Sequence, residues 1–571
     1  MKRRLVGLET EYAFRISSAG ERPDHRDLYE SFLRSLQRLT RTVEGSSSMK
    51  WRQIFTQNGS ALCYESMPSH PDGGFLEGAT PECDRPALTA LYQLAQDRLL
   101  ARCLTDAESD LRQRYPDIRI GLIKNCRDAD GHIYGAQENY EAQFLPPEGP
   151  LKWIYRIALA LHLLFAIPYL LLIQLLSFSV FIGGVIVFVF AAFLLLLFSP
   201  FWPELSAIEK KDRLFRRFER AAGVMLGAVD VVLSVPVGLP FLTMAGRLGF
   251  RKQRKAISAF LISRIILTGS GSLSKEGVFE ISEKASSVRR LVRSTNLPSE
   301  RVVFDTGNLY KDLGMSAMPI FRLGLAPFRK LFATTQRMQI GLSDSCMSHI
   351  PLFLKTMLTT LLLDMAEAGY LDDAPRLTSP VKALHILNRD VQVKATVQTS
   401  EGVMTALQIQ RWYADRARTY LKDFPDVEMV RAVQLWEELL HDLAEDRRRC
   451  FGRLDWVTKE ILIDRGNDFE AKKTVDLYYH ELGTGYHQKL RDEGLIVDLF
   501  SEEEIARAMD EPPDTMRGNA VIRSEIIKDS SLFGESVQVS WDHVRIGRGL
   551  RSQVLSLDEF RKRKRAGSNP A

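Results

Sequence analysis

Alternating apolar and polar residues open the chain and predict strands in its first quarter. The alternation runs through Arg4–Phe14 and again through Ile118–Asn125, and the second run is followed by the turn-forming sequence Asp128–Gly131. We therefore interpret residues 1–149 as strands joined by turns.

Helical spacing of apolar residues dominates residues 260–500. Leu and Met recur every three or four positions through Phe353–Ala368, and Gly369 then predicts the end of that helix. Ser286–Thr295 and Met404–Lys422 follow the same spacing, so we predict helices there as well.

A long uncharged run separates these two parts. From Ile157 to Pro203 the chain has 47 residues without Asp, Glu, Lys or Arg. One membrane crossing takes about 20 apolar residues, so the run fits a two-helix hairpin whose turn lies near Gln174–Ser179 or at Gly183–Gly184. The alternative is a pair of buried core helices. The run starts too far along the chain to be a signal peptide.

Basic clusters flank a second apolar stretch, Val224–Phe250. That stretch contains Asp230, and a charge at membrane depth is costly, so we expect an interfacial or re-entrant segment. Lys210–Arg217 precedes it and Arg251–Lys255 follows it, and the positive-inside rule places both clusters in the cytoplasm. We expect the protein at the inner (cytoplasmic) membrane, with its soluble domain in the cytoplasm.

Composition narrows the class of protein. At 571 residues, 45% hydrophobic and 26% charged, the chain is globular and long enough for several domains. Its 76 basic and 71 acidic side chains leave a net charge of +5, too mild to indicate nucleic acid as a partner. The six cysteines form no C-x-x-C pair, which favours reduced thiols. The basic tail within 545–571 predicts a solvated end able to touch anionic lipid.

Paired carboxylates give the first sign of chemistry. Glu9 and Glu11 project to one face of the first predicted strand, where they repel each other unless a cation lies between them. Oxygen ligands of this kind suit Mg²⁺ or Mn²⁺. The other interpretation is a solvated strand face. The sequence has no Walker loop, zinc-protease motif or serine-hydrolase elbow.

Ten short motifs then follow one another along the chain. They are Gly7–Tyr12, Asn58–Gly59, Ala79–Cys83, Lys124–Asn125, Tyr134–Tyr140, Gly341–Ser348, Ala406–Arg411, Leu454–Val457, Asp476–His480 and Glu511–Arg517. In this order they resemble the Pup ligase and depupylase family (proteasome accessory factor A-like), within the carboxylate-amine ligase and glutamine synthetase superfamily. The resemblance covers about 1–149 and 255–530.

The resemblance implies an α+β fold: a glutamine-synthetase-like antiparallel β-sheet cradle backed by helices. We expect the ligase-like domain in two parts, 1–149 and 256–480, separated by a membrane insert over 150–255. A small C-terminal domain with the basic tail is expected over 481–571. Members of the family use ATP and Mg²⁺ to phosphorylate the terminal carboxylate of Pup, a ubiquitin-like modifier, which a lysine of a target protein then attacks.

The resemblance also assigns roles to single residues of this chain, each matched to a functional position of the family. Glu9 matches a metal-binding glutamate, and Glu77 matches another when Pro71–Leu76 is treated as an insertion. Glu65 falls on the catalytic aspartate, which takes a proton from the incoming ammonium.

Three further positions concern the nucleotide. Thr80 and Trp456 fall on nucleotide-binding positions, and Arg337 falls on an arginine that is a candidate phosphate contact.

The same comparison shows departures from the family pattern. The family has an arginine at Ala61, a tyrosine at Cys63 unless Tyr64 substitutes through a one-residue slip, and an aspartate at Glu65. A Thr-Arg-Asp-Glu-Pro-His stretch becomes Thr306–Lys311, and His-Glu-Asn becomes Gln137–Asn139.

Three functions remain open on these residues. The first is a membrane-anchored ligase that forms an isopeptide bond through an acyl phosphate. The second is a catalytically degenerate paralogue that partners or anchors an active ligase subunit. The third is a depupylase-type amidohydrolase, which ranks lower because the segment from Glu9 to Asn58 is too short for the long loop of depupylases.

Overall fold

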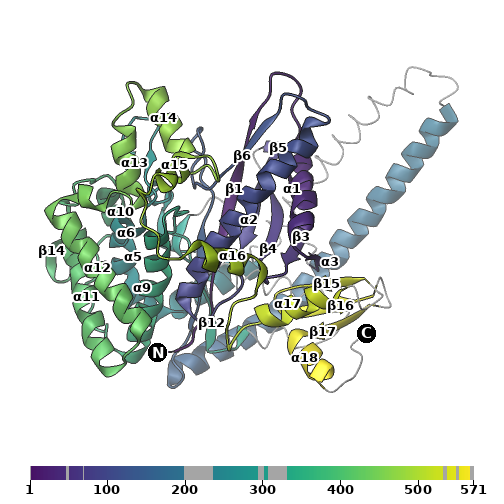
Figure 1. Ribbon diagram of the computed structural model, residues 1–571. Helices are drawn as coiled ribbons and strands as arrows, with labels where there is room; N and C mark the ends of the chain where they lie inside the picture. The colour runs from purple at the N-terminus through teal and green to yellow at the C-terminus, as the bar shows by residue number, and fades with distance from the viewer. Residues whose placement is uncertain are drawn as a thin grey trace.

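The computed structural model describes residues 2–46, 50–67, 70–198, 236–293, 301–306, 331–530, 536–547 and 552–565. A tall twisted sheet stands in the middle of the molecule, with helices α1 and α2 against it and a helical lobe at one side (Figure 1). Helix α3 extends away from the rest at the opposite side (Figure 1).

The large sheet has 13 strands in the order β10-β11-β12-β7-β1-β5-β4-β3-β2-β15-β16-β17, with β6 also paired to β1. It is antiparallel as predicted, except that β10–β11 and β2–β15 pair in parallel. Its strands are β1 (Val6–Ser17), β2 (Thr42–Gly45), β3 (Trp51–Thr56), β4 (Ala61–Met67), β5 (His70–Ala79), β6 (Arg119–Ile123), β7 (Gln137–Gln143), β10 (Arg290–Val292), β11 (Val302–Asp305), β12 (Thr335–Ile340), β15 (Val537–Val539), β16 (His543–Ile546) and β17 (Gln553–Ser556).

Two short hairpins lie outside this sheet, β8 (Ser272–Leu273) with β9 (Phe279–Glu280), and β13 (Thr396–Thr399) with β14 (Gly402–Thr405). The α-helices are α1 (His25–Leu39), α2 (Pro86–Arg112), α3 (Pro150–Phe198), α5 (Arg251–Ser263), α6 (Ile265–Thr268), α9 (His349–Ala368), α10 (Pro380–Asn388), α11 (Ala406–Asp423), α12 (Val427–Glu445), α13 (Asp455–Ile463), α14 (Phe469–Tyr478), α15 (Tyr486–Asp492), α16 (Glu502–Asp510), α17 (Ala520–Asp529) and α18 (Leu557–Arg565).

Strand β1 shows why the sheet has one covered and one open face. Its even-numbered residues from Val6 to Tyr12 are buried, and its odd-numbered residues are only partly so. Thr10 bonds Gln93 of α2 at 3.0 Å and the Tyr12 hydroxyl donates to Asp97 of α2 at 2.7 Å. Helix α2 therefore covers the even side, and the acidic residues of β1 are left on the other.

The helical lobe confirms most of the helices expected over 260–500. Helix α9 covers the predicted Phe353–Ala368 and ends at Gly369 in the left-handed conformation, with φ of +90°. Helix α11 agrees with the predicted Met404–Lys422 and begins with a capping box formed by Thr405 and Gln408.

Two local predictions are wrong. Residues 1–149 contain the helices α1 and α2 in addition to strands, and α2 alone is 27 residues long. The described part of Ser286–Thr295, up to Arg293, is not an α-helix: a short 3-10 turn is followed by β10, which pairs in parallel with β11. The β-branched Val288 and Val292 favour that extended backbone, so tertiary pairing overrides an apolar spacing that looked helical.

The apolar insert does not form the predicted hairpin. Helix α3 continues for 49 residues, from Pro150 to Phe198, through both positions where we expected the turn. Gly183–Gly184 costs a helix only about 1 kcal/mol per glycine relative to alanine, a cost that one long helix tolerates. Residues 199–235, with the basic cluster at 210–217, lie outside the described part of the chain.

The first half of α3 has one buried and one exposed stripe. The residues at positions 155, 159, 163 and 166 pack into the main core, at the spacing of one helix face. By length and composition Pro150–Tyr169 is able to cross a membrane, with a mean hydropathy of 1.4 and 22% of it buried. The opposite face carries the exposed residues Trp153, Ile154, Ile157, Leu161, Leu164 and Phe165.

The second apolar stretch is partly a core element. Residues 236–248 are helical, and Val237, Phe241 and Ala245 belong to the main core. The ring of Phe241 stacks on His162 of α3, with centroids 6.0 Å apart. The part of the expected interfacial segment that is described thus packs on the protein itself.

The C-terminal segment closes the far edge of the sheet. Strand β15 pairs in parallel with β2, so residues expected to form a separate small domain extend the central sheet (Figure 1). A second core nevertheless forms there, from Ile522, Ile526 and Phe560 packed on Phe55 and Ala61. All six cysteines are free, as the sequence predicted, and all six are buried.

Candidate active site

Acidic residues gather on the open face of the sheet. In the antiparallel register Glu11 of β1 lies directly opposite Glu77 of β5, and Glu77 lies opposite Cys63 of β4. Directly opposed residues point to the same face of a sheet, and so do residues two apart on one strand. Glu9 and Glu65 therefore share this face, which we call the acidic face.

Burial disfavours the charged forms of two carboxylates in this cluster. Burial raises the pKa of Glu11 above its ordinary value; the Gly135 amide, which donates to its carboxylate at 2.8 Å, opposes that rise and the charge of Glu77 adds to it. Burial also raises the pKa of Glu77, which Lys50 lowers and Glu65 raises. Carboxylates so placed gain from a positive charge between them.

Lys50 supplies one such charge. Its ammonium contacts the Glu77 carboxylate and lies 3.8 Å from Oε2 of Glu65. Burial lowers the pKa of Lys50, but the charge of Glu77, the smaller contributions of Cys63 and Glu65 and the hydrogen bond to Glu77 together outweigh burial, so that the pKa is raised overall. The thiol of Cys63 donates to the same Glu77 oxygen at 3.4 Å. Glu65 itself is open, with 49% of its side chain exposed.

Basic residues border the other side of the acidic face. Arg337 of β12 lies 3.5 Å from Glu9, and about half of its side chain is exposed. Arg301 and Lys284 influence the pKa of Glu11, and burial lowers the pKa of Lys284. Carboxylates next to cations on one open surface suit a divalent metal bound together with phosphate groups.

The acidic face fits Mg²⁺ by its donor set. Glu9, Glu11 and Glu77 offer hard carboxylate oxygens from adjacent strands, and Glu11 and Glu77 have raised pKa values because they are largely withdrawn from water. Cys63 is a softer donor, and burial raises the pKa of its thiol, which favours the protonated form that binds metals poorly. The carboxylates, and not the thiol, are therefore the residues to hold the ion.

The structure brings together four of the six predicted site residues, Glu9, Glu65, Glu77 and Arg337. Thr80 and Trp456 lie elsewhere, and both are buried. The Thr80 hydroxyl accepts from the Leu8 amide at 3.0 Å, and the Trp456 indole donates to the Ile266 carbonyl at 2.8 Å. Their roles as nucleotide contacts stay predictions. Residues 307–311, where the family has a charged stretch, lie outside the described residues.

Lys50 is the site residue that sequence reasoning missed. It lies just before β3 in a stretch without an ionic pattern, so no local signal links it to Glu65 or Glu77. Its position follows from the pairing of β3, β4 and β5, which only the three-dimensional register gives.

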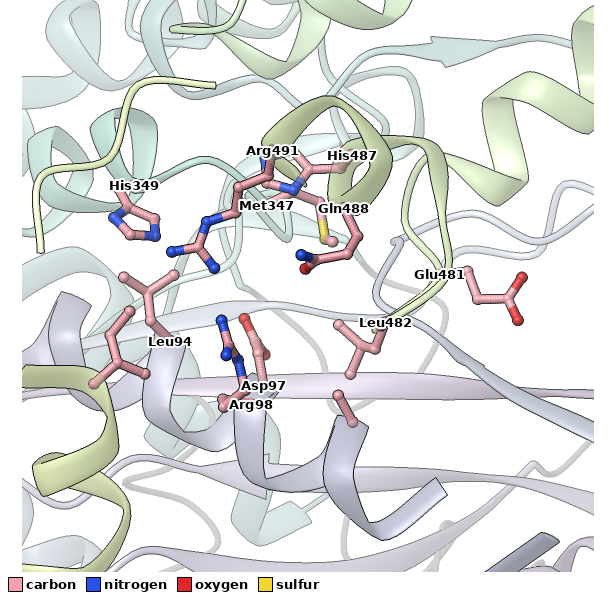
Figure 2. A pocket seen from close by; sticks show the side chains of 13 residues that line it. Leu94, Asp97, Arg98, Met347, His349, Glu481, Leu482, His487, Gln488 and Arg491 are labelled. Carbon is pink, nitrogen blue, oxygen red and sulfur yellow. The ribbon is translucent and has the colours of Figure 1, made fainter. Parts of the chain in front are cut away.

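A cavity of about 60 Å³ lies on the covered side of the sheet (Figure 2). It opens between α2 and α15, and Asp97, His349, His487 and Arg491 are among its lining residues. Arg491 pairs with Asp498 at 2.8 Å. Since β1 and α2 lie between this cavity and the acidic face, it is not part of the candidate active site.

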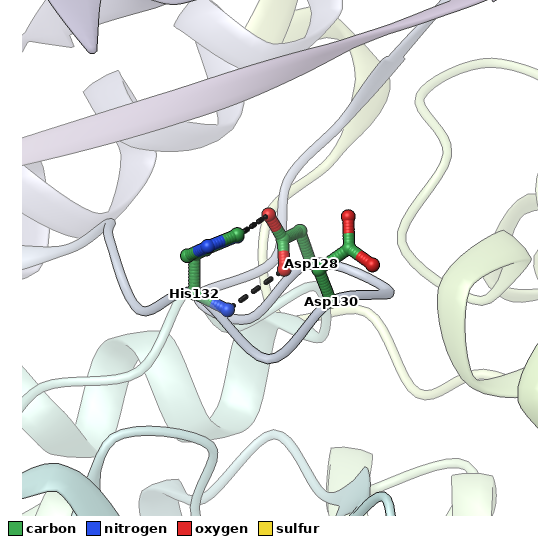
Figure 3. A group of neighbouring side chains, drawn as sticks. All are labelled: Asp128, Asp130 and His132. Carbon is green, nitrogen blue, oxygen red and sulfur yellow. Dashed lines mark hydrogen bonds and ion pairs between the residues drawn. The ribbon is translucent and has the colours of Figure 1, made fainter. Parts of the chain in front are cut away.

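A second group of potential metal ligands lies in a turn. Ligand atoms of Asp128, Asp130 and His132 lie within 4.8 Å of one another (Figure 3). Asp128 accepts from the main-chain amide of His132 at 2.8 Å and contacts its ring at the same distance. These bonds close the predicted turn at 128–131, where Gly131 has a φ of +80°, and account for the grouping without a metal.

Comparison with known proteins agrees with this architecture. The Pup ligase PafA in complex with Pup has the same fold, with a TM-score of 0.65 and 21% identity over 99% of this chain and 93% of that one. PafA in complex with ADP gives a TM-score of 0.59 and 21% identity, with 97% of each chain covered.

The sequence relatives cover nearly whole chains. The Pup--protein ligase of Acidimicrobium ferrooxidans is 23% identical, over 98% of this chain and 96% of its own. Pup--protein ligase 1 of Rhodococcus erythropolis is 24% identical, over 98% and 97%. The sequence model of the family described as Pup-ligase protein matches residues 4–545. This chain therefore belongs to the Pup-ligase family.

Proposed function

We propose that this protein is a Pup--protein ligase, which joins the terminal carboxylate of a Pup-like modifier to a lysine of a target protein. The observation that carries the proposal is the acidic face, where Glu9, Glu11 and Glu77 lie beside the exposed Arg337. Carboxylate and amine do not condense unaided, because a carboxylate is a poor electrophile. ATP bound with Mg²⁺ supplies the phosphoryl group that activates it.

In this proposal each side chain has a defined task. Glu9 and Glu77 hold Mg²⁺, and the guanidinium of Arg337 binds phosphate oxygens. Glu65 reaches outward from the same face and takes a proton from the incoming lysine ammonium. Glu11, held by the Gly135 amide, keeps the floor of the site negative.

The test separates activation from conjugation. The full-length protein is incubated with ATP, Mg²⁺, hydroxylamine and a Pup-like peptide ending in glutamate, since hydroxylamine traps an acyl phosphate as a hydroxamate. We expect hydroxamate and ADP from the wild type, and loss of both in Glu9→Gln. Glu437→Gln removes a partly exposed carboxylate that pairs with Arg418 far from the acidic face, and it should change neither. Wild type without hydroxamate would contradict the proposal and favour a degenerate partner of an active ligase.

We also propose that the protein is anchored at the inner (cytoplasmic) membrane through α3, with the ligase-like part in the cytoplasm. The exposed stripe of large apolar residues on α3 supports this, because such surfaces mark membrane or protein contacts. Lys152 and Arg156 both lie over the ring of Trp153, a grouping typical of a membrane interface.

Flotation with vesicles of anionic phospholipid tests the anchor. The wild type should float with the vesicles, and a variant in which Ile157, Leu161 and Leu164 become Gln should remain at the bottom of the gradient. Equal flotation of both would contradict anchoring through this face.

A further inference from the structure

A cavity of about 250 Å³ opens on the helical lobe, between the start of α5 and the segment that follows α9. Its inner part is apolar, since the lining residues Ala256, Leu371 and Ala374 are buried. Its charged lining residues are Lys252, Lys255, Arg376 and Asp372. Three positive charges against one negative charge leave these side chains with a net charge of +2.

The protein itself does not neutralise this charge. Within the part of the chain that the structure describes, the side chains of Lys255 and Arg376 form no ion pair and no hydrogen bond. Lys252 lies 3.9 Å from Asp372, at the outer limit of an ion pair. The neighbouring acid, Asp373, pairs with an arginine of α11 instead. Two cations of the cavity are therefore free to bind a ligand.

The start of α5 adds to the positive potential. Its first five residues, Arg251–Lys255, include four cations, and its first turn has no acidic residue. A helix N-terminus carries a partial positive charge of its own, so cations are unfavourable there and anions are stabilised. Burial and the charge of Arg251 lower the pKa of Arg254 to about 10, in keeping with repulsion between like charges. A bound anion would offset this repulsion.

A phosphate monoester matches the cavity in charge and in geometry. It carries about −1.5 to −2 charges at pH 7, nearly the opposite of the cavity, whereas a phosphate diester carries a single charge. The guanidinium of Arg376 offers parallel donors for two phosphate oxygens, and a lysine ammonium offers a point charge. A water molecule takes about 30 Å³ of the liquid, so the cavity has room for a phosphate group.

The position of the cavity indicates a source for this group. Phe250, the residue before α5, packs on Phe144 with ring centroids 5.0 Å apart, and Phe144 packs on Tyr155 of α3 at 5.1 Å. The start of α5 therefore lies beside the base of α3, the helix proposed as the membrane anchor. Phosphate at a membrane surface is carried by lipid headgroups.

We propose that this cavity is a binding site for a phosphate monoester, a group that the headgroup of a lipid such as phosphatidate shares with soluble phosphate esters. Lys255 and Arg376 bind the phosphate oxygens, and Lys252 adds a third positive charge. The site is independent of the proposed ligase activity. The lipid as its source rests on the proposed anchor through α3.

Isothermal titration of glycerol 3-phosphate into the full-length protein in an uncharged detergent tests the site. EDTA keeps the acidic face free of metal, so that its carboxylates repel the probe. A variant with both Lys255→Gln and Arg376→Gln should bind at least about tenfold more weakly than wild type, because one charge-assisted hydrogen bond alone is worth about that factor. Asp372→Asn removes the opposing charge and should bind more tightly.

The matched control combines Lys275→Gln with Arg465→Gln. It removes a lysine and an arginine from exposed positions outside the cavity, and it should bind as wild type does. No binding by wild type, or equal affinities of the wild type and the cavity variants, would overturn the proposal.

Nanodiscs distinguish the two sources of phosphate. The same titration is repeated with the protein in discs of phosphatidylcholine that contain either phosphatidate, a monoester, or phosphatidylglycerol, a diester. Phosphatidate should occupy the cavity and abolish the heat of glycerol 3-phosphate binding, and phosphatidylglycerol should leave it. Equal heats in both discs would overturn the lipid as the source and support a soluble phosphate ester as the ligand of the site.

Discussion

At the scale of single residues, Glu65 is the side chain whose role is easiest to isolate. Glu65→Gln cannot accept a proton, so conjugation to lysine should fall by about 10²–10⁴-fold. Hydroxylamine is neutral near pH 7 and attacks without a base to remove a proton first, so the hydroxamate yield should persist. Both rates are followed in the same samples by mass spectrometry, and loss of both would show that Glu65 serves activation instead.

Glu65→Asp is the matched variant at that position. It restores the carboxylate found at this position in the family but shortens the side chain by one methylene, and a displacement of about 1 Å can cost about 10²-fold in rate. Conjugation retained or raised would mean that the acceptor position is family-like. A large loss would mean that the loop carrying Lys50 has been rebuilt around the longer acid.

Two buried histidines predict a fall in stability on acidification. Burial lowers the pKa of His349 and of His487 to about 4, from an ordinary value near 6.5. The unfolded chain then binds more protons than the folded one between pH 6.5 and 4, so the free energy of unfolding should decrease as pH falls through that window. Urea unfolding of His487→Gln should show a weaker decrease than wild type; equal slopes would contradict the assignment.

The residues of the site were only partly predictable. Glu9 was accessible because alternation along a strand fixes that it shares a face with Glu11, and Glu77 was accessible only through its match to the family pattern. Thr80 and Trp456 matched motifs, yet their polar atoms are bonded to main-chain groups inside the core. Lys50 could not be found, since its partners are set by strand register and not by spacing in the sequence.

At the scale of elements, the end of α9 is a test of local backbone chemistry. Gly369 has a φ of +90°, and an added Cβ would meet Asp372 at 3.6 Å, which is ordinary contact. Gly369→Ala should therefore destabilise through the backbone alone, by about 1–2 kcal/mol. Gly20→Ala is the control, because Gly20 has open space and no positive φ, and it should change stability little. Equal urea midpoints for the two variants would contradict this.

Elements with a regular apolar pattern were predicted well, and those shaped by distant contacts were not. Helices α9 and α11 have clear apolar spacing and caps, which are local signals. Helix α2 is buried on most sides, so its pattern lacks a polar face. For α3, charge and length predicted a two-helix hairpin where one long helix forms, because the glycine pair permits both.

At the scale of the whole molecule, several residues of the motifs that predicted the family stabilise the fold by hydrogen bonds inside the core. Asp344 accepts hydrogen bonds from the main chain of Ser270, Glu283 and Lys284 at 3.0–3.2 Å. Asp455 likewise accepts from Ser348. Buried carboxylates used in this way fix the fold, which explains why motifs identified the architecture better than the ligands. The parallel pairing of β2 with β15 joins residues almost 500 positions apart and has no local signal.

The insert offers a test of where the folded core ends. His162 of α3 stacks on Phe241, and Tyr155 is linked through Phe144 to Phe250, so α3 and residues 236–250 run antiparallel. Positions 169 and 236 therefore lie near each other, and a short Gly/Ser linker should span them. Replacing residues 170–235 in this way removes apolar surface and, among the residues that the structure describes, none that belongs to the main core.

Replacing 151–250 instead removes Tyr155, Leu159, Leu163 and Phe241, all of them in the main core. Each such loss costs about 2–5 kcal/mol, and together they exceed the stability of most domains. We expect the 170–235 replacement to melt cooperatively and to keep hydroxamate formation, and the 151–250 replacement to aggregate. Calorimetry and centrifugation without detergent measure both. If the larger replacement folds as well as the smaller one, the base of α3 is only an anchor; if both aggregate, the long helix is itself part of the fold.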